Sequence, residues 1–205
     1  MLIRRLILLF PGLALYGLST ALMVRADLGL NPWNVLHQGL ARATGASIGT
    51  VIVVVGVILL LAWIPLRQWP GFGTVSNVML IGVTADASLA VLPSPHTLAL
   101  RLVALVAAVA LNGLATGMYI GAGLGAGPRD GLMTGLAART GCSIRVARTG
   151  VEVSALALGW LLGGTVGLGT VLYAAAIGPV IQVVLPAFQR WRERGAAPVA
   201  GELRA

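Results

Sequence analysis

The chain has no lysine, one cysteine and two histidines among its 205 residues. The single cysteine, Cys142, excludes an intrachain disulfide. The absence of lysine excludes a Schiff-base enzyme and a phosphate-binding loop that ends in a lysine. His37 and His96 lie far apart, and no histidine or cysteine pair has the spacing of a metal site. We therefore expect no enzymatic activity, no cofactor and no metal ion.

Charged residues are also scarce. They make up 10% of the chain, against about 25% in a soluble domain, while hydrophobic residues make up 58%. Too few polar groups remain to cover a surface in water, so we expect the chain in a lipid bilayer. The net charge of +8 comes from fourteen arginines at the ends of apolar runs and near the C-terminus. This distribution is typical of membrane orientation and argues against nucleic-acid binding.

Six apolar segments are long enough for a bilayer core of about 30 Å, which needs roughly 20 helical residues. They are residues 6–24, 48–66, 73–92, 99–120, 145–163 and 168–186. The first follows Arg4 and Arg5 in the manner of a signal peptide. It is longer than a usual signal core, so we interpret it as a permanent span.

The chain also contains an internal repeat. Residues 17–82 align without a gap on residues 113–178, and 25 of the 66 aligned positions are identical. We therefore divide the chain into a first half (residues 1–96), a second half (97–188) and a cytoplasmic tail (189–205) that we expect to be disordered. Duplicated halves that meet inside a bilayer are the architecture of many transporters.

Each half carries a short polar segment between its first two spans, at residues 25–46 and 121–142. Pro32 and Pro128 suit the first turn of a helix, and Gly45 and Gly141 suit its C-terminal cap. A serine that follows each glycine, at 47 and 143, has the position of an N-cap for the next span. The pattern predicts helices of about 20 Å, too short to span comfortably.

Two interpretations of these short helices are open. In the re-entrant interpretation a glycine-rich limb descends into the membrane, and the positive N-terminus of the helix points to the midplane. In the interfacial interpretation the face of Trp33, Leu36 and Leu40 lies on the membrane surface. Either way three spans per half make the repeats inverted, with both termini cytoplasmic. If the short helices cross instead, the repeats are parallel.

Charged residues inside the predicted spans are candidates for function, because ionisable groups are costly in lipid. Asp86 is a candidate for a solute or proton pathway, or for a salt bridge with Arg25 or Arg101. Glu152 is a candidate for the same pathway, or for an ion pair with Arg148 one helical turn away.

Two further features predict packing. Asn112 suits a hydrogen bond between helices. The run Gly113, Gly117 and Gly121 has the spacing that lets helices approach closely, and we expect it to join the two halves.

Two motifs carry a family resemblance: Gly-Leu-Asn-Pro-Trp-Asn at 29–34 and Gly-Pro-Arg-Asp-Gly-Leu-Met at 127–133, the latter followed by Gly-Trp-Leu-Leu-Gly-Gly at 159–164. From about residue 10 to residue 186 the chain resembles the YczE/YyaS/YitT-type bacterial membrane proteins, and among them the YczE branch. The resemblance implies a multi-pass protein of the bacterial plasma (inner) membrane, of a kind sometimes linked to secondary-metabolite production or its regulation. It brings no catalytic residue.

Together these features predict an all-α polytopic membrane protein with six transmembrane helices, arranged as two inverted three-helix repeats, each with a short re-entrant or interfacial helix. The leading hypothesis is a small secondary transporter or exporter of an unidentified small solute, bound between the repeats. The alternative is a non-transporting scaffold or regulatory partner. We expect the lipid bilayer and the solute as partners, with a homodimer left open. The candidate binding residues are Asn31, Pro32, Asn34, Gly127, Pro128, Arg129, Asp130, Asp86 and Glu152.

Overall fold

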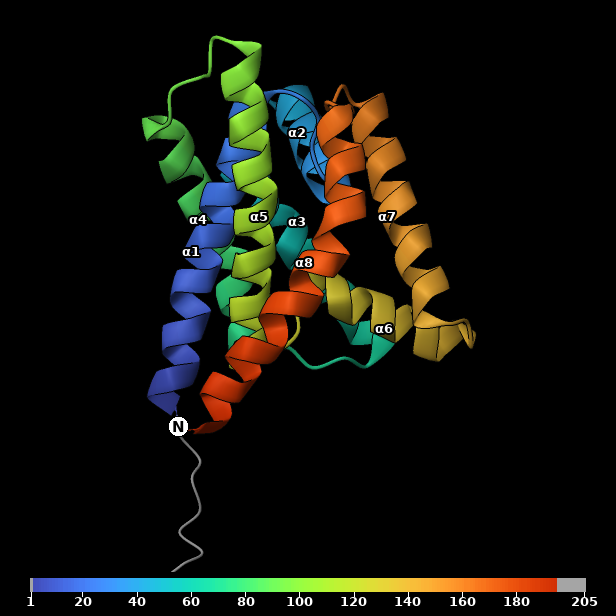
Figure 1. The fold of residues 1–205 in the computed structure, drawn as a ribbon. Helices are drawn as coiled ribbons and strands as arrows, with labels where there is room; N and C mark the ends of the chain where they lie inside the picture. Colours follow the sequence, from blue (N-terminus) through green and yellow to red (C-terminus); the bar gives the residue numbers. More distant parts are fainter. Residues whose placement is uncertain (1, 195–205) are drawn as a thin grey trace, which may run out of the picture.

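A computed structural model describes residues 2–194, which form eight α-helices (Figure 1). These are α1 (Leu2–Ala26), α2 (Pro32–Thr44), α3 (Ile48–Leu66), α4 (Phe72–Val91), α5 (Leu98–Ala122), α6 (Pro128–Thr140), α7 (Ile144–Leu161) and α8 (Leu168–Glu193). Within the described residues, α1, α3, α4, α5 and α8 are long and apolar enough to cross a membrane. The expected sixth span, α7, is not among them, because it carries Arg145, Arg148 and Glu152 within 18 residues.

The two short helices begin and end where the local sequence predicts. Pro32 and Pro128 occupy their first positions, where the missing N–H costs nothing. Gly45 and Gly141 end them in the left-handed conformation, with φ of 74° and 72°. In both cases the next helix starts with a serine side chain that accepts a hydrogen bond from a backbone N–H three residues later.

The C-terminal helix is longer than predicted. Helix α8 continues to Glu193, so residues 189–193 of the expected disordered tail are helical. Two long-range contacts hold this end: Arg192 donates to the Gly121 carbonyl at 3.2 Å, and Arg4 donates to the Trp191 carbonyl at 3.1 Å. Residues 195–205 of the expected tail lie outside the described part of the chain.

Helices α1 and α5, the first of each half, pack along each other at the centre of the bundle (Figure 1). Leu9, Leu13 and Tyr16 of α1 belong to one buried cluster with Ala115 and Tyr119 of α5. Helix α4 packs against α1, and α8 packs against α5. Each half therefore contributes one inner and one outer helix to this core.

The glycine run of α5 packs within its own half, so the expectation that it joins the halves is wrong. Side chains at these positions would collide with α8, where the neighbours are Val180, Val184 and Phe188. The halves meet instead where α1 crosses α5, and there Gly12 lies against Met118 and Tyr119.

Several contacts occur twice, 96 residues apart. The backbone N–H of Gly73 donates to the Leu124 carbonyl at 2.8 Å, and that of Gly169 donates to the Leu28 carbonyl at 2.7 Å. In each hydrogen bond the donor belongs to one half and the acceptor to the other. The equivalent stretches of the two halves therefore make equivalent contacts with each other.

Each short helix is held by the opposite half. Helix α2 packs on α7 through Gly39 and Gly159, and α6 packs on α3, where Gly131 lies against the ring of Trp63. Figure 1 places α2 near one end of the bundle and α6 near the other. Their C-terminal ends are exposed, whereas Asn31 and Gly127, which precede their first residues, are buried.

Candidate functional site

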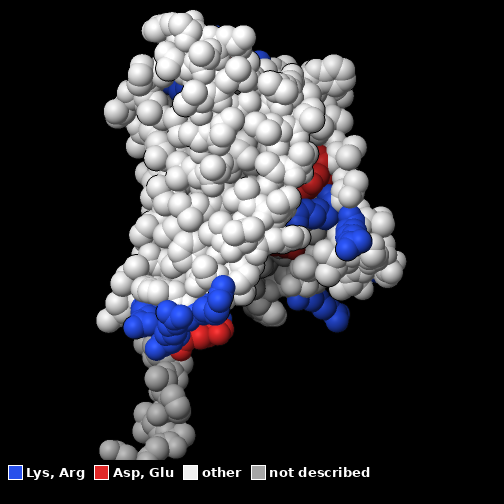
Figure 2. All heavy atoms as spheres, viewed as in Figure 1, with Lys and Arg blue, Asp and Glu red and all other residues white. Residues whose placement is uncertain are grey.

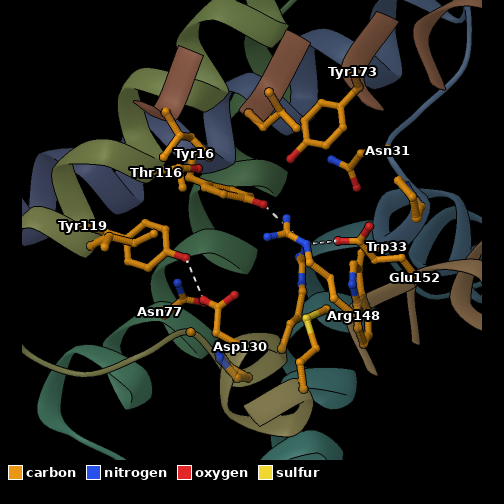
Figure 3. Close-up of a pocket in the computed structure, with 18 of the residues that line it drawn as sticks. Tyr16, Asn31, Trp33, Asn77, Thr116, Tyr119, Asp130, Arg148, Glu152 and Tyr173 are labelled. Carbon is orange, nitrogen blue, oxygen red and sulfur yellow. Dashed lines mark hydrogen bonds and ion pairs between the residues drawn. The ribbon is translucent and has the colours of Figure 1, made fainter. Parts of the chain in front are cut away.

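A cavity of about 430 Å³ lies at the N-terminal ends of both short helices (Figure 3). All the described helices except α3 contribute to its wall. Its polar and aromatic lining consists of Tyr16, Asn31, Trp33, Asn77, Thr116, Tyr119, Arg129, Asp130, Arg148, Glu152 and Tyr173. The volume is in the range of sites for small organic molecules.

Seven of the nine candidate residues line this cavity. They are Asn31, Pro32, Gly127, Pro128, Arg129, Asp130 and Glu152. The structure thus brings the two repeated motifs, far apart in the sequence, to one place. Asn34 and Asp86 are not part of its wall.

Asn34 points from α2 toward α1. Its side chain is 1% exposed, and its Nδ2 donates to the hydroxyl of Thr20 at 3.3 Å. Its backbone N–H donates to Asn31 Oδ1 at 2.9 Å, which caps α2. Asn34 therefore fastens the start of α2 to the core.

Asp86 caps α3. Its Oδ1 accepts a hydrogen bond from the backbone N–H of Gly49 at 2.7 Å, and its Oδ2 accepts one from the Ser47 hydroxyl. The two arginines considered as its partners bind elsewhere, Arg25 to Ser94 and Arg101 to Asp27. The carboxylate is thus engaged in joining α4 to α3.

Arg129 lies on an aromatic surface. Its guanidinium carbon is 5.1 Å from the centre of the Trp33 ring, and its Nη1 donates to the Tyr16 hydroxyl at 3.3 Å. No carboxylate of the described residues lies within ion-pair distance of it. The guanidinium therefore brings to the cavity a positive charge that is not held in an ion pair with any described residue.

Two buried donors in the cavity wall have no hydrogen-bond partner among the described residues: Nδ2 of Asn31 and Nε1 of Trp33. These residues are 1% and 6% exposed. In Figure 3 the Asn31 amide faces the cavity opposite Tyr173. A buried donor left unsatisfied costs about 1–3 kcal/mol, so the arrangement favours a ligand or water that accepts hydrogen bonds here.

The carboxylates of the cavity already have partners. Asp130 accepts a hydrogen bond from the Tyr119 hydroxyl at 3.2 Å. Glu152 pairs with Arg148 at 2.9 Å, which confirms the ion pair considered for it in the sequence. This pair lies on the cavity wall, so Glu152 is both a pairing residue and a lining residue.

A polar network supports the opposite wall. Asn112 donates to the Ser19 hydroxyl at 2.8 Å and accepts from the Tyr173 hydroxyl at 3.0 Å. The predicted hydrogen bond of Asn112 between helices is confirmed. It also fixes the position of Tyr173.

Sequence reasoning missed the aromatic part of the site. The chain has three tyrosines, Tyr16, Tyr119 and Tyr173, and all of them line the cavity. The available signal was their rarity, together with a phenol hydroxyl inside three apolar segments that otherwise have little need of it.

The cavity reaches the surface on the side of α7 and α8. Figure 2 shows acidic and basic side chains in a recess on this side, surrounded by uncharged surface. The charged residues of the wall are Arg129, Asp130, Arg148 and Glu152, and the Arg148 side chain is 56% exposed. The cavity is therefore open to the surface of the molecule in this structure.

Comparison with known proteins gives a family and two groups of relatives. The chain matches the family of unknown function DUF6198 over residues 3–186. It is 41% identical over 179 residues to an uncharacterized protein from Haemophilus influenzae, covering 87% of this chain and 82% of that one. No solved structure matches the chain.

The Bacillus subtilis relatives carry the names that the motifs suggested. The chain is 33% identical to the uncharacterized membrane protein YczE, covering 86% of this chain and 83% of YczE. It is 26% identical to the uncharacterized protein YyaS, covering 87% and 91%. The predicted resemblance is confirmed, and this all-α integral membrane protein belongs to the DUF6198 family.

Proposed function

We propose that this protein is a small secondary transporter or exporter of the bacterial inner membrane, and that its solute binds in the cavity between α2 and α6. The observation that carries the proposal is the position of the cavity. Residues of both halves line the cavity, and the N-terminal residues of both short helices are among them. Broken or short helices that meet near the middle of a bilayer are a recurrent way to bind solutes in transporters.

The proposed architecture consists of two inverted repeats with six spans, α7 included. The exchanged hydrogen bonds Gly73–Leu124 and Gly169–Leu28 support it. So does the contact of Arg129 with Trp33, because these positions are equivalents in the repeat. A residue can touch its own equivalent only near the axis that relates the two halves, so this axis would pass beside the cavity.

The proposed orientation places both termini in the cytoplasm. Basic side chains gather where α1 begins and α8 ends, as Figure 2 shows. This end carries Arg4, Arg5, Arg190 and Arg192. An excess of arginine on one side is the usual mark of the cytoplasmic face.

A transport cycle would exchange the conformations of the two halves. In the state described here α3 is closed on α4, whereas α7 makes almost no close backbone contact with its counterpart α8 in the described part of the chain. Closing α7 on α8 and opening α3 from α4 would turn the cavity toward the other side. Exchange of this kind between repeated halves is how inverted-repeat transporters give alternating access to a central site.

Cysteine labelling tests this proposal. Ile81 and Ile177 are repeat equivalents, and both line the cavity. Each is replaced by cysteine in a Cys142→Ala background and labelled with a membrane-impermeant thiol reagent in intact cells and in inverted vesicles. A transporter gives labelling of each position from both sides, because the cavity opens to each side in turn.

The controls are the native Cys142 and an Ala46→Cys variant, which report the ends of α6 and α2. In inverted repeats the cysteine at position 46 and Cys142 react from opposite sides of the membrane. Labelling of both cavity positions from a single side would reject transport and support a non-transporting scaffold or regulatory partner.

A further inference from the structure

We propose that the solute is a small organic anion, whose oxyanion group is bound by Arg129, Asn31 and Trp33 while its apolar body lies against the tyrosines. This inference rests on the proposed function only in taking the cavity as the solute site. It names a ligand chemistry that can be tested by binding, without transport.

The cavity wall has hydrogen-bond donors without acceptors among the described residues. Nδ2 of Asn31 and Nε1 of Trp33 are buried and without partners among the described residues. The guanidinium of Arg129 stands 5.1 Å from the ring that carries this indole N–H. All three residues line the cavity, and each brings a donor that a carboxylate or phosphate oxygen can accept from.

The backbone at the start of the two short helices also favours an anion. Helices α2 and α6 have 13 residues each, and both point their N-termini into the cavity. The first N–H groups of a helix lack intrahelical acceptors and carry a partial positive charge. Two such ends at one cavity favour an anion over a cation.

The two acidic side chains of the cavity wall already have partners. Asp130 accepts from Tyr119, and Glu152 pairs with Arg148. A cationic solute would have to compete with Arg148 for Glu152, whereas an anionic solute finds Arg129 with no carboxylate of the described residues within ion-pair distance. Arg129 therefore remains available to an anion, while Asp130 is hydrogen-bonded and Glu152 is ion-paired.

The rest of the wall suits an apolar body. Tyr16 and Tyr119 meet edge to face with ring centres 6.3 Å apart. The remaining side chains are largely aliphatic, among them Ile81, Ile120 and Ile177. An aromatic or branched body fits such walls by stacking and dispersion.

The test uses three probes of one shape: benzoate, benzamide and benzamidine, which are anionic, neutral and cationic. The full-length protein in detergent is titrated with each probe into the tens of millimolar, with sodium chloride matched, while its thermal unfolding midpoint is recorded. We expect benzoate to raise the midpoint, benzamide to act about tenfold more weakly, and benzamidine to have no effect.

Variants assign the response to the site. Arg129→Gln should abolish the benzoate shift, Arg129→Lys should keep part of it, and Trp33→Phe should weaken binding several-fold. Arg139→Gln is the matched control on the same helix, because Arg139 binds the Pro65 carbonyl far from the cavity wall. It should leave the benzoate response unchanged. The midpoint without probe reports whether each variant is folded.

Three results overturn the inference: an equal or larger response to benzamide or benzamidine, a benzoate response that survives in folded Arg129→Gln, or no response to benzoate and to aliphatic monocarboxylates. The two proposals fail separately. If the protein binds the anion but its cavity cysteines react from one side only, the anion site is retained and transport is rejected. Labelling from both sides without anion binding rejects the ligand class alone.

Discussion

The two halves of the molecule differ most in how their last two helices pack. In the first half α3 is pressed against α4, and Gly49 and Gly82 lie in direct contact at the crossing. In the second half the equivalents are Arg145 and Gly178, and a side chain added at Gly178 would meet nothing within 4 Å. A contact that needs two small residues is lost where one of them has become an arginine.

The same exchange occurs two turns further along. Gly56 of α3 packs on Val78, whereas its equivalent in α7 is Glu152, which lines the cavity. Helix α7 has therefore kept the length and the N-cap of α3, but charged residues replace the small residues through which α3 packs. The open side of the cavity follows from this trade.

The largest difference between the two halves is expected for the substitutions Gly82→Ala and Gly178→Ala. The added methyl group at 82 collides with the Gly49 carbonyl and should lower the free energy of unfolding by about 1–3 kcal/mol. At position 178 the added methyl group meets no neighbour within 4 Å, and the better helix propensity of alanine should raise the free energy of unfolding by up to about 1 kcal/mol. Unfolding in mixed micelles with increasing SDS measures both. Equal losses at the two positions would mean that α8 is as tightly covered as α4.

A smaller effect is expected from the capping carboxylate of the first half. Asp86→Ala removes hydrogen bonds to the backbone and side chain at the start of α3, and should cost about 1 kcal/mol. Its equivalent Gln182 is exposed, so Gln182→Ala should change the free energy of unfolding by less than about 0.5 kcal/mol. The same SDS titration checks the pair. A larger loss of unfolding free energy for Gln182→Ala would contradict the difference between the α3–α4 and the α7–α8 contacts.

The features of the fold that depend on local sequence could be predicted. The boundaries of α2 and α6 depend on local chemistry, a proline at the first turn and a glycine at the last, and they were predicted. Residues 31–32 and 127–130 are equivalent segments of the repeat, and a shared site between the two halves was predicted for them. Both segments line the cavity.

What could not be predicted depends on contacts between distant residues. Asn34 and Asp130 are equivalents, yet Asn34 turns to Thr20 on α1 and Asp130 faces Tyr119 across the cavity. Sequence spacing fixes the helix face of such a residue but not the neighbour that covers it. The extension of α8 likewise depends on Arg192 reaching the Gly121 carbonyl.

The substitution Gly178→Leu distinguishes an effect on the stability of the fold from an effect on the movement of α7 against α8. Gly178→Leu fills the open side of α8 and should change the free energy of unfolding by less than about 0.5 kcal/mol, because nothing packs there in the state described. If the halves exchange conformations, α7 must later close on this position, as α3 closes on Gly82, and a leucine would prevent it. We therefore expect the cysteine at Ile81 or Ile177 to lose its labelling from one side in the Gly178→Leu background, while labelling from the other side persists. Gly150→Leu is the control, since Gly150 also has no neighbour within 4 Å but lies on α7 outside the cavity wall. Unchanged labelling from both sides in Gly178→Leu would mean that α7 and α8 never adopt the closed arrangement of α3 and α4, and that the difference between the halves is a fixed feature of the fold.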